Sequence, residues 1–214
     1  MNILEFIQNL QPSIILEIGA HFGTETQDFR RLLPNAEIIA FEPDPRNIKI
    51  LKEREVDKIC KLEEFALSNT NGKLEFYLSS GDCTNLLSDT LFTSNDWSAS
   101  SSLKKPKVHL DFHKWITFDE KVEVDSIRLD DYEYLNDRII DFIWMDVQGA
   151  EDLVFKGSIE TLKRTKYVYT EYNNQEMYEG QLNVQQILEL IGPDWEIVYV
   201  YSDDVLLKNK KYAV

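Results

Sequence analysis

Apolar and polar positions divide the chain into short segments with either a helical or a strand-like period. Apolar residues recur at helical spacing from Ile3 to Leu10, and Pro12 ends that pattern, so residues 1–12 are predicted to carry an N-terminal helix. Residues 14–18 are a run of branched apolar side chains that stops at a glycine, which predicts a buried strand.

The two periods continue to alternate along the rest of the chain. Further strands are predicted at 38–41, 61–67, 72–78, 122–129, 139–145, 167–170, 195–201 and 205–208. Further helices are predicted at 26–33, 45–54, 150–164 and 184–191. This order predicts an α/β protein with a mostly parallel seven-stranded sheet and helices on both faces, and the last strand pair predicts an antiparallel edge.

Residues 79–117 lack either period and hold mainly polar residues with isolated aromatics. So long an irregular segment in a small protein is usually functional. The length of 214 residues favours a single domain that spans residues 1–214. Residues 79–117 are expected to be a variable insertion in this domain, either a lid over a binding site or a segment that binds the acceptor substrate.

Charge narrows the classes of partner. Lys and Arg total 23 against 38 Asp and Glu, which gives a net charge of −15. Such a protein repels a phosphate backbone, so no nucleic-acid partner is expected, although a small nucleotide-like cofactor remains compatible. Hydrophobic residues make up 43% of the chain, enough for a buried core.

The cysteines and the N-terminus indicate the compartment. Cys60 and Cys83 form no C-x-x-C motif, so a disulfide framework or a zinc ribbon is not expected. The first ten residues carry Glu5 and no basic residue, unlike a signal peptide. No apolar run approaches the ~20 residues needed to cross a bilayer. We therefore expect a cytoplasmic protein without a membrane partner.

Two glycines follow the first predicted strand. Gly19 and Gly23 lie where that strand turns into a helix, and a ligand can approach their backbone closely. The segment lacks both the third glycine of the dinucleotide fingerprint and the Lys-Ser/Thr pair of a P-loop.

Two carboxylates bear on the identity of the cofactor. Glu17 precedes the first glycine, where it would repel a pyrophosphate and attract an ammonium or sulfonium group. Glu42 ends the second strand, where it is placed to accept hydrogen bonds from ribose hydroxyls. Together they favour S-adenosylmethionine over NAD, unless both merely cap the ends of strands.

Four segments in order resemble the motifs of FkbM-type methyltransferases. They are Glu17-Ile-Gly-Ala-His-Phe-Gly23, Phe41-Glu-Pro-Asp-Pro45, Phe65-Ala-Leu-Ser68 and Met145-Asp-Val-Gln-Gly-Ala-Glu151. The resemblance covers about residues 14–171. It implies a Rossmann-like class I S-adenosylmethionine-dependent fold and O-methylation, often of sugar hydroxyls. Two departures are Gln148, where many relatives carry Glu, and Arg128, where Thr is common.

The resemblance also implies roles for particular residues. Residues 19–24 would hold the methionine part of the cofactor, Glu42 the ribose and residues 64–66 the adenine. The serine cluster 98–102 resembles a loop that closes over the cofactor, although such runs are commonly flexible linkers. The full set of expected cofactor-binding residues is Glu17, Gly19, Ala20, His21, Gly23, Thr24, Glu42, Pro43, Phe65, Ala66, Ser101 and Asp146.

Three residues are candidates for the catalytic base. His109 lies near the serine cluster, and histidine titrates near neutral pH, although an ordinary loop histidine is the plainer interpretation. Asp146 and Glu171 each end a predicted strand, at the edge of the sheet where ligands bind. The two carboxylates could converge on the acceptor as a base, or bind Mg²⁺, but two ligands do not define a metal site.

The sequence therefore predicts an S-adenosylmethionine-dependent O-methyltransferase whose acceptor is a small molecule or glycan, most readily a sugar hydroxyl. An NAD-dependent oxidoreductase is the first alternative, although no tyrosine is followed four residues later by lysine. A methyltransferase for another small molecule or for nucleic acid is the second, although no Asn/Asp-Pro-Pro-Tyr or Pro-Cys motif occurs. A binding domain without activity is the third. Residues 79–117 and 173–183 are expected to set acceptor specificity.

Overall fold

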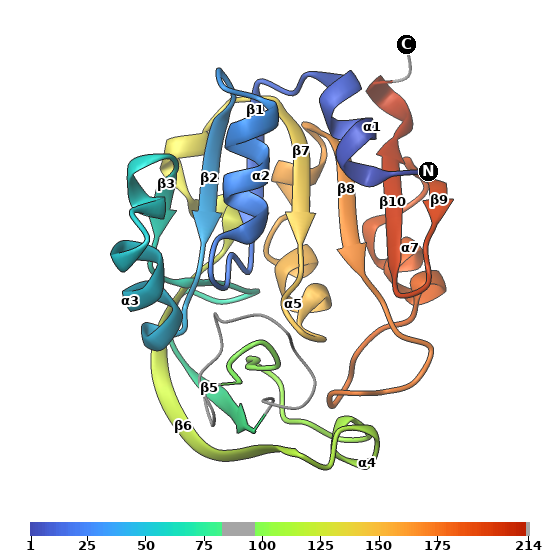
Figure 1. The fold of residues 1–214 in the computed structure, drawn as a ribbon. Helices are drawn as coiled ribbons and strands as arrows, with labels where there is room; N and C mark the ends of the chain where they lie inside the picture. The colour runs from blue at the N-terminus through green and yellow to red at the C-terminus, as the bar shows by residue number, and fades with distance from the viewer. Residues whose placement is uncertain (83–96, 213–214) are drawn as a thin grey trace.

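The computed structural model describes residues 1–82 and 97–212, and its main feature is a seven-stranded sheet (Figure 1). The strand order is β3-β2-β1-β7-β8-β10-β9; the first five are mutually parallel, and β10 runs antiparallel to β8 and β9. The strands are β1 (Ile14–Ile18), β2 (Glu37–Phe41), β3 (Lys61–Glu63), β7 (Ile140–Met145), β8 (Thr165–Glu171), β9 (Trp195–Val200) and β10 (Asp204–Asn209). The predicted fold class and its antiparallel edge are confirmed.

Helices cover both faces of this sheet, because its central strands carry apolar side chains on both of their faces. In β1, Ile15 packs on one face with Ile7 and Phe29, whereas Leu16 packs on the other face with Phe155. The first face carries α1 (Ile3–Leu10) and α2 (Thr24–Leu32), and the second carries α5 (Glu151–Lys156), α6 (Ile159–Leu162) and α7 (Val184–Ile191). The remaining helices are α3 (Pro45–Glu53), α4 (His109–Phe112) and the 3-10 turns Val56–Lys58, Leu129–Asp131, Glu133–Leu135 and Lys210–Tyr212.

A second, three-stranded sheet lies beyond the carboxyl ends of the large sheet's parallel strands (Figure 1). Its order is β4-β6-β5, with β4 (Ala66–Leu67), β5 (Gly72–Gly81) and β6 (Ile116–Ile127). The predicted single strand 61–67 is therefore wrong: β3 pairs with β2 in the large sheet, and β4 pairs with β6 in the small one. The irregular segment is also shorter than expected, because β5 and β6 extend into both of its ends and α4 lies within it.

The predicted helix 150–164 is two short helices, α5 and α6, separated at Gly157 and Ser158. Gly157 ends α5 against the segment between β4 and β5 of the small sheet: a Cβ on Gly157 would lie 1.9 Å from the carbonyl oxygen of Ser68. Helical spacing of the apolar residues continues through the break, so the pattern alone did not reveal it. The break lets the chain pack closely between the two sheets.

In the ranges 1–82 and 97–212, no helix combines the length and the apolar character that crossing a bilayer requires. Cys60 is half-buried with a free thiol, and Cys83 lies outside the described residues.

The contact at Gly157 predicts a large cost for a single methyl group. We expect Gly157→Ala to lower the free energy of unfolding by at least about 2 kcal/mol, because the atom it meets belongs to backbone and cannot move aside cheaply. Gly72→Ala is the control, since a Cβ there meets nothing within 4 Å and only its positive φ is strained. Denaturant unfolding checks both variants, and equal losses would contradict a collision at Gly157.

Candidate active site

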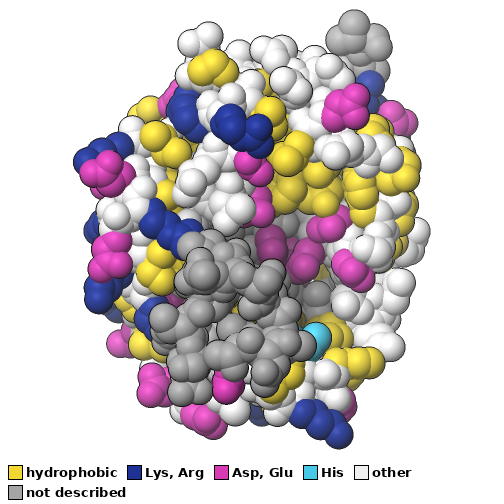
Figure 2. Space-filling view, viewed as in Figure 1, with side chains coloured by type: hydrophobic (Ala, Val, Ile, Leu, Met, Phe, Trp, Pro, Cys, Tyr) yellow, Lys and Arg dark blue, Asp and Glu magenta, His cyan; other side chains and the backbone are white. Residues whose placement is uncertain are grey.

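A cavity of about 270 Å³ opens beyond the carboxyl ends of β1, β2 and β7. Acidic side chains gather near the centre of this face of the molecule (Figure 2). The described residues that line the cavity include Glu25, Glu42 and Asp146 but no Lys or Arg. The others are Ile18, Gly19, His21, Thr24, Phe41, Pro43, Asn47, Phe65, Ala66, Leu67, Phe76, Ser98, Ala99, Ser101, Leu103, Trp144, Val147, Gln148 and Ala150.

The turn from β1 to α2 forms the floor of this cavity. Gly19 has a φ of +92° and donates its backbone N–H to the Phe41 carbonyl oxygen at 2.9 Å. A Cβ on Gly19 would lie 1.9 Å from the Asp146 carbonyl oxygen, so only glycine allows β1 to end against β7. Gly23 has a φ of +76° and is the N-cap of α2, where it closes the turn by donating to Ala20 at 2.7 Å. Gly23 and Ala20 support the turn from behind rather than line the cavity.

Glu42 follows β2 and is buried in the cavity wall. One carboxylate oxygen accepts the His21 backbone N–H at 2.7 Å, and the other accepts the Asp44 backbone N–H at 2.8 Å and the Asn47 amide at 3.3 Å. Burial raises the pKa of Glu42 to about 8, against the lowering effect of these donors. Oε2, which accepts only the His21 N–H, has a second lone pair, so Glu42 is held in place by the chain and can still accept from a ligand.

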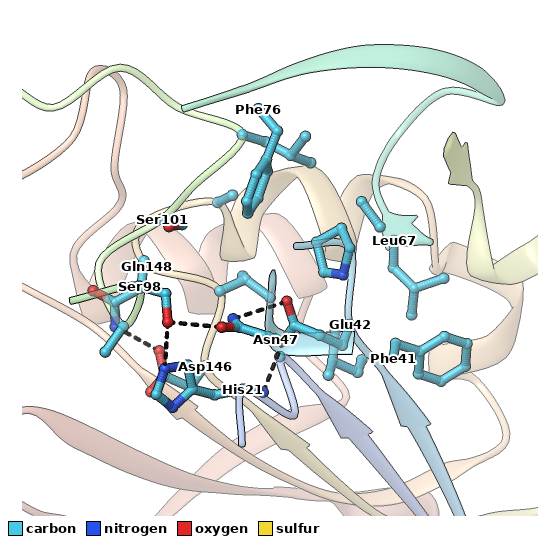
Figure 3. Close-up of a pocket in the computed structure, with 18 of the residues that line it drawn as sticks. His21, Phe41, Glu42, Asn47, Leu67, Phe76, Ser98, Ser101, Asp146 and Gln148 are labelled. Carbon is cyan, nitrogen blue, oxygen red and sulfur yellow. Dashed lines mark hydrogen bonds between the residues drawn. The ribbon is translucent and has the colours of Figure 1, made fainter. Parts of the chain in front are cut away.

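A chain of hydrogen bonds joins Glu42 to the serine-rich segment (Figure 3). Ser98 Oγ donates to Asn47 Oδ1 at 2.7 Å and lies 3.0 Å from His21 Nε2. Since the hydroxyl hydrogen of Ser98 is donated to Asn47, His21 Nε2 is the donor to Ser98 Oγ. The pKa of His21 is lowered to about 4, chiefly by burial.

Residues 98–103, here called the serine segment, form part of the cavity wall. Arg46 and the Ser79 backbone N–H both donate to Ser101 Oγ, at 3.1 and 3.0 Å. Ser102 pairs with Tyr77 of β5 in a short antiparallel bridge. Ser98, Ser100 and Ser102 are buried, so this segment is packed rather than a solvated linker.

The apolar end of the cavity is formed by aromatic and aliphatic residues from β2 and the small sheet. Phe65 lies between Phe41 and Tyr132, with ring centroids 5.7 and 6.0 Å apart. Ala66 and Phe76 complete this end. Glu64, which the resemblance grouped with them, instead forms an ion pair with Lys52 outside the cavity lining.

The structure brings Asp146 and Glu171 together at the ends of β7 and β8, as the strand pattern predicted. Asp146 lines the cavity, and Glu171 lies behind it. The side-chain amide of Gln148 donates to both carboxylates, at 2.7 Å to Asp146 Oδ1 and 3.2 Å to Glu171 Oε2. Burial raises the pKa of Asp146 and, together with the charge of Asp146, raises that of Glu171 well above its usual range. In the described part of the chain, no cluster of three or more His, Cys, Asp or Glu residues could hold a metal ion.

His109 does not line the cavity among the described residues. It is buried in α4, where its Nε2 lies 3.2 Å from Ser100 Oγ and its ring contacts Tyr178 and Phe118. Burial and the neighbouring His113 lower its pKa to about 4, which makes it a weak base. His109 contacts the serine cluster, as their closeness in the sequence suggested, but it is not among the described residues that line the cavity.

Glu17 also lies outside the lining, contrary to the role inferred for it. It is buried beneath α2 and accepts a hydrogen bond from Thr26, and burial raises its pKa to about 8. The acidic residue that does line the cavity next to Asp146 is Glu25, whose pKa is raised by burial. Sequence reasoning missed Glu25; its place in the first turn of the helix after the glycine turn was the available signal.

Other lining residues also escaped the sequence interpretation. Asn47 and Trp144 lie within regular elements, where the pattern assigns them only to a helix or a strand. Phe76 lies in β5, where the pattern predicts only a strand. Of the expected cofactor residues, Gly19, His21, Thr24, Glu42, Pro43, Phe65, Ala66, Ser101 and Asp146 do line the cavity.

The sheet order, the glycine turn after β1 and the acidic residue after β2 define a Rossmann-like class I methyltransferase fold. An O-methyltransferase from Bacillus cereus, solved in complex with SAH, superposes with a TM-score of 0.50 at 13% identity, over 95% of this chain and 76% of that one.

Residues 17–201 match the methyltransferase FkbM domain, and the chain belongs to that family. The chain is also 39% identical to the 2-O-methyltransferase NoeI of Sinorhizobium fredii (strain NBRC 101917 / NGR234), over 98% of this chain and 84% of that protein.

Burial of Glu17 predicts how stability depends on pH. A folded-state pKa near 8 means that Glu17 stays protonated in the folded protein at pH values where it is ionised in the unfolded chain. The contribution of Glu17 to stability is therefore fully present below about pH 4.5 and is lost as the pH rises through 8. We expect Glu17→Gln to gain about 3 kcal/mol relative to the native protein between pH 5 and pH 8, because glutamine cannot ionise. Urea unfolding at several pH values measures the difference. Glu5→Gln, at an exposed position in α1, is the control, and a Glu17→Gln profile parallel to the native one would refute the burial argument.

Proposed function

We propose that this protein transfers a methyl group from S-adenosylmethionine to a hydroxyl oxygen of a sugar or glycan. The observation that carries the proposal is the charge of the cavity: its described lining has three carboxyl groups and no Lys or Arg. Such a lining favours a positively charged nucleoside over the pyrophosphate of NAD. The 39% sequence identity to a 2-O-methyltransferase, over 98% of this chain, supports oxygen as the acceptor atom.

The residues of the cavity fit this cofactor in three parts. Glu42 Oε2 has a free lone pair for a ribose hydroxyl, and Phe65 and Ala66 offer apolar contact for the adenine. The turn that begins at Gly19, with Glu25 beside it, is the place for the methionine part and its ammonium group. The bound cofactor supplies a methyl group on a positively charged sulfur, open to attack by an oxygen nucleophile.

Asp146 is the proposed base that accepts the proton of the acceptor hydroxyl. Its carboxylate lines the cavity, and Glu171 lies behind it, where it can share a proton with Asp146. A sugar hydroxyl is a poor nucleophile until its proton leaves, so base assistance is worth about 10²–10⁴-fold in rate. Holding the hydroxyl in line with the methyl group contributes about 7–11 kcal/mol to lowering the barrier.

We further propose that residues 1–214 form one methyltransferase domain in which residues 79–117 and 173–183 select the acceptor. The serine segment supports this assignment, because it lines the cavity and packs against Tyr178 of the second region. The described parts of both regions lie at the carboxyl edge of the sheet, where loops on a rigid scaffold commonly set specificity.

Cofactor selection is tested by calorimetry with S-adenosylhomocysteine and NAD. We expect saturable binding of S-adenosylhomocysteine and much weaker binding of NAD. Glu42→Ala should weaken S-adenosylhomocysteine binding by about 10–100-fold, since hydrogen bonds to a charged group are worth about 1.5–3 kcal/mol. Glu63→Gln is the matched control, because this carboxylate ends the neighbouring strand β3 and bonds to Tyr132 outside the cavity. Equal affinity for NAD, or an unaffected Glu42→Ala variant, would contradict the proposed cofactor.

The choice of base is tested by comparing Asp146→Asn with His109→Gln. We expect kcat for methyl transfer to fall by about 10²–10⁴-fold in Asp146→Asn and by less than about threefold in His109→Gln. Because burial raises the pKa of Asp146, the native rate should increase with pH above the range in which an ordinary aspartate ionises, as that carboxyl loses its proton. A collapse of kcat in His109→Gln alone would reverse the assignment.

The assay for both variants uses a panel of sugars and glycans with a radiolabelled methyl donor, in the presence and absence of EDTA. Transfer to at least one sugar hydroxyl supports the proposed acceptor class, and transfer only to non-sugar hydroxyls would overturn it. Loss of activity with EDTA that Mg²⁺ restores would add a metal to the mechanism.

A further inference from the structure

The side chain of Gln148 links the two carboxylates at the sheet edge to the segments that cover them. Its amide nitrogen lies 2.7 Å from Asp146 Oδ1 and 3.2 Å from Glu171 Oε2, so both amide hydrogens are used (Figure 3 shows the bond to Asp146). On the opposite side, its amide oxygen lies 3.2 Å from the Tyr178 hydroxyl. The carboxamide therefore bridges the ends of β7 and β8 and the region 173–183.

This arrangement selects one orientation of the carboxamide. If the amide were turned over, its oxygen would face the oxygens of Asp146 and Glu171, and the contacts would be repulsive unless both carboxyls carried protons. The hydroxyl of Tyr178 favours the observed orientation, because its single hydrogen is shared in a three-centre bond between the Ser100 carbonyl oxygen at 2.8 Å and Gln148 Oε1 at 3.2 Å. Tyr178 thus holds the amide of Gln148 with its hydrogens toward the carboxylates.

The backbone at Gln148 is strained and is held by independent contacts. Its φ is +52°, a left-handed conformation that costs roughly 1–2 kcal/mol for a residue with a side chain. Glu151 accepts the backbone N–H of Gly149 at 3.1 Å, and the ring of Tyr178 covers Gly149 so closely that a Cβ there would lie 2.7 Å from it. Strain that several contacts maintain at the edge of a cavity points to a functional constraint.

We propose that Gln148 and Tyr178 are positioning residues for methyl transfer: Gln148 orients the Asp146 carboxylate toward the acceptor, and Tyr178 fixes the orientation of Gln148. This inference rests on the proposed function. Without the amide of Gln148, Asp146 Oδ1 would lose the hydrogen bond that fixes its direction. Because Tyr178 also bonds to Ser100, the same contact ties the orientation of the base to the placement of the serine segment.

The test is a double-mutant cycle on the full chain. Gln148→Met keeps the length of the side chain without its hydrogen bonds, and Tyr178→Phe keeps the ring that covers Gly149 without its hydroxyl. We expect kcat to fall by about 10–100-fold in Gln148→Met and about 3–10-fold in Tyr178→Phe, since a misplaced catalytic group can cost up to about 10²-fold. The double variant should be no slower than Gln148→Met by more than about twofold, because both changes remove one linkage.

Two further readouts separate positioning from a general loss of structure. The rising part of the pH–rate profile should move to higher pH in Gln148→Met, because the hydrogen bond that favours ionised Asp146 is gone. The dissociation constant for S-adenosylhomocysteine, measured by calorimetry, should change by less than about threefold in Tyr178→Phe. The other titratable groups that interact with Asp146 are Glu25, Glu151, Glu171 and Asp204. All four are present in every variant, so they do not account for a difference between the pH profiles.

Tyr172→Phe is the matched control, because Tyr172 is also buried and its hydroxyl bonds only weakly, at 3.5 Å to the Tyr201 carbonyl oxygen. It should keep native kcat. Rates that multiply in the double variant, an unmoved pH profile, or kcat within twofold of native in Gln148→Met would overturn the positioning role while leaving the proposed function intact. An unaltered protein that binds S-adenosylhomocysteine but methylates no hydroxyl in the acceptor panel would overturn both.

Discussion

The contact between the β1–α2 turn and the end of β7 is the constraint on which the site depends. Gly19 approaches the backbone of Asp146 so closely that any side chain would collide with it. This contact sets the depth of the cavity and brings a residue of the first motif beside one of the last, 127 positions later in the chain. The parallel pairing of β1 with both β2 and β7 places Glu42 and Asp146 on either side of the same turn.

Buried carboxyl groups give this cavity its chemical character. Glu42 and Asp146 line it, and burial raises the pKa of each, because charged oxygens lose their solvation inside the protein. No Lys or Arg from the described lining offsets that cost. A ligand that brings a positive charge and hydroxyl donors would offset part of this desolvation cost. The buried carboxyl groups would therefore favour a cationic nucleoside over an anionic one.

Local signals predicted the fold and most of the residues that line the cavity where the cofactor is proposed to bind, and the missed features depend on contacts between distant segments. Gly19 and Glu42 were predictable because each stands directly after an apolar strand, where a parallel sheet binds its ligands. The division of residues 61–67 between two sheets was not predictable, because the pattern of a strand does not indicate which strand it pairs with. The break at Gly157 depends on Ser68, which is distant in sequence. The position of His109 outside the described cavity lining was not predictable, because distance along an irregular segment says little about which of its residues face a cavity.

Alternate residues of the serine segment connect the two halves of the site. Ser98 bonds to Asn47, which bonds to Glu42 in the cofactor half. Two positions later, the Ser100 carbonyl accepts from Tyr178, which continues to Gln148. Residues 98–101 form a turn in which the Ser101 N–H donates to the Ser98 carbonyl oxygen at 3.1 Å, so a displacement of Ser98 also displaces Ser100. The serine segment therefore cannot move away from one half of the site and stay on the other without breaking buried hydrogen bonds. Because such bonds are costly to leave unmade, the segment should respond as a unit to whatever occupies the cavity.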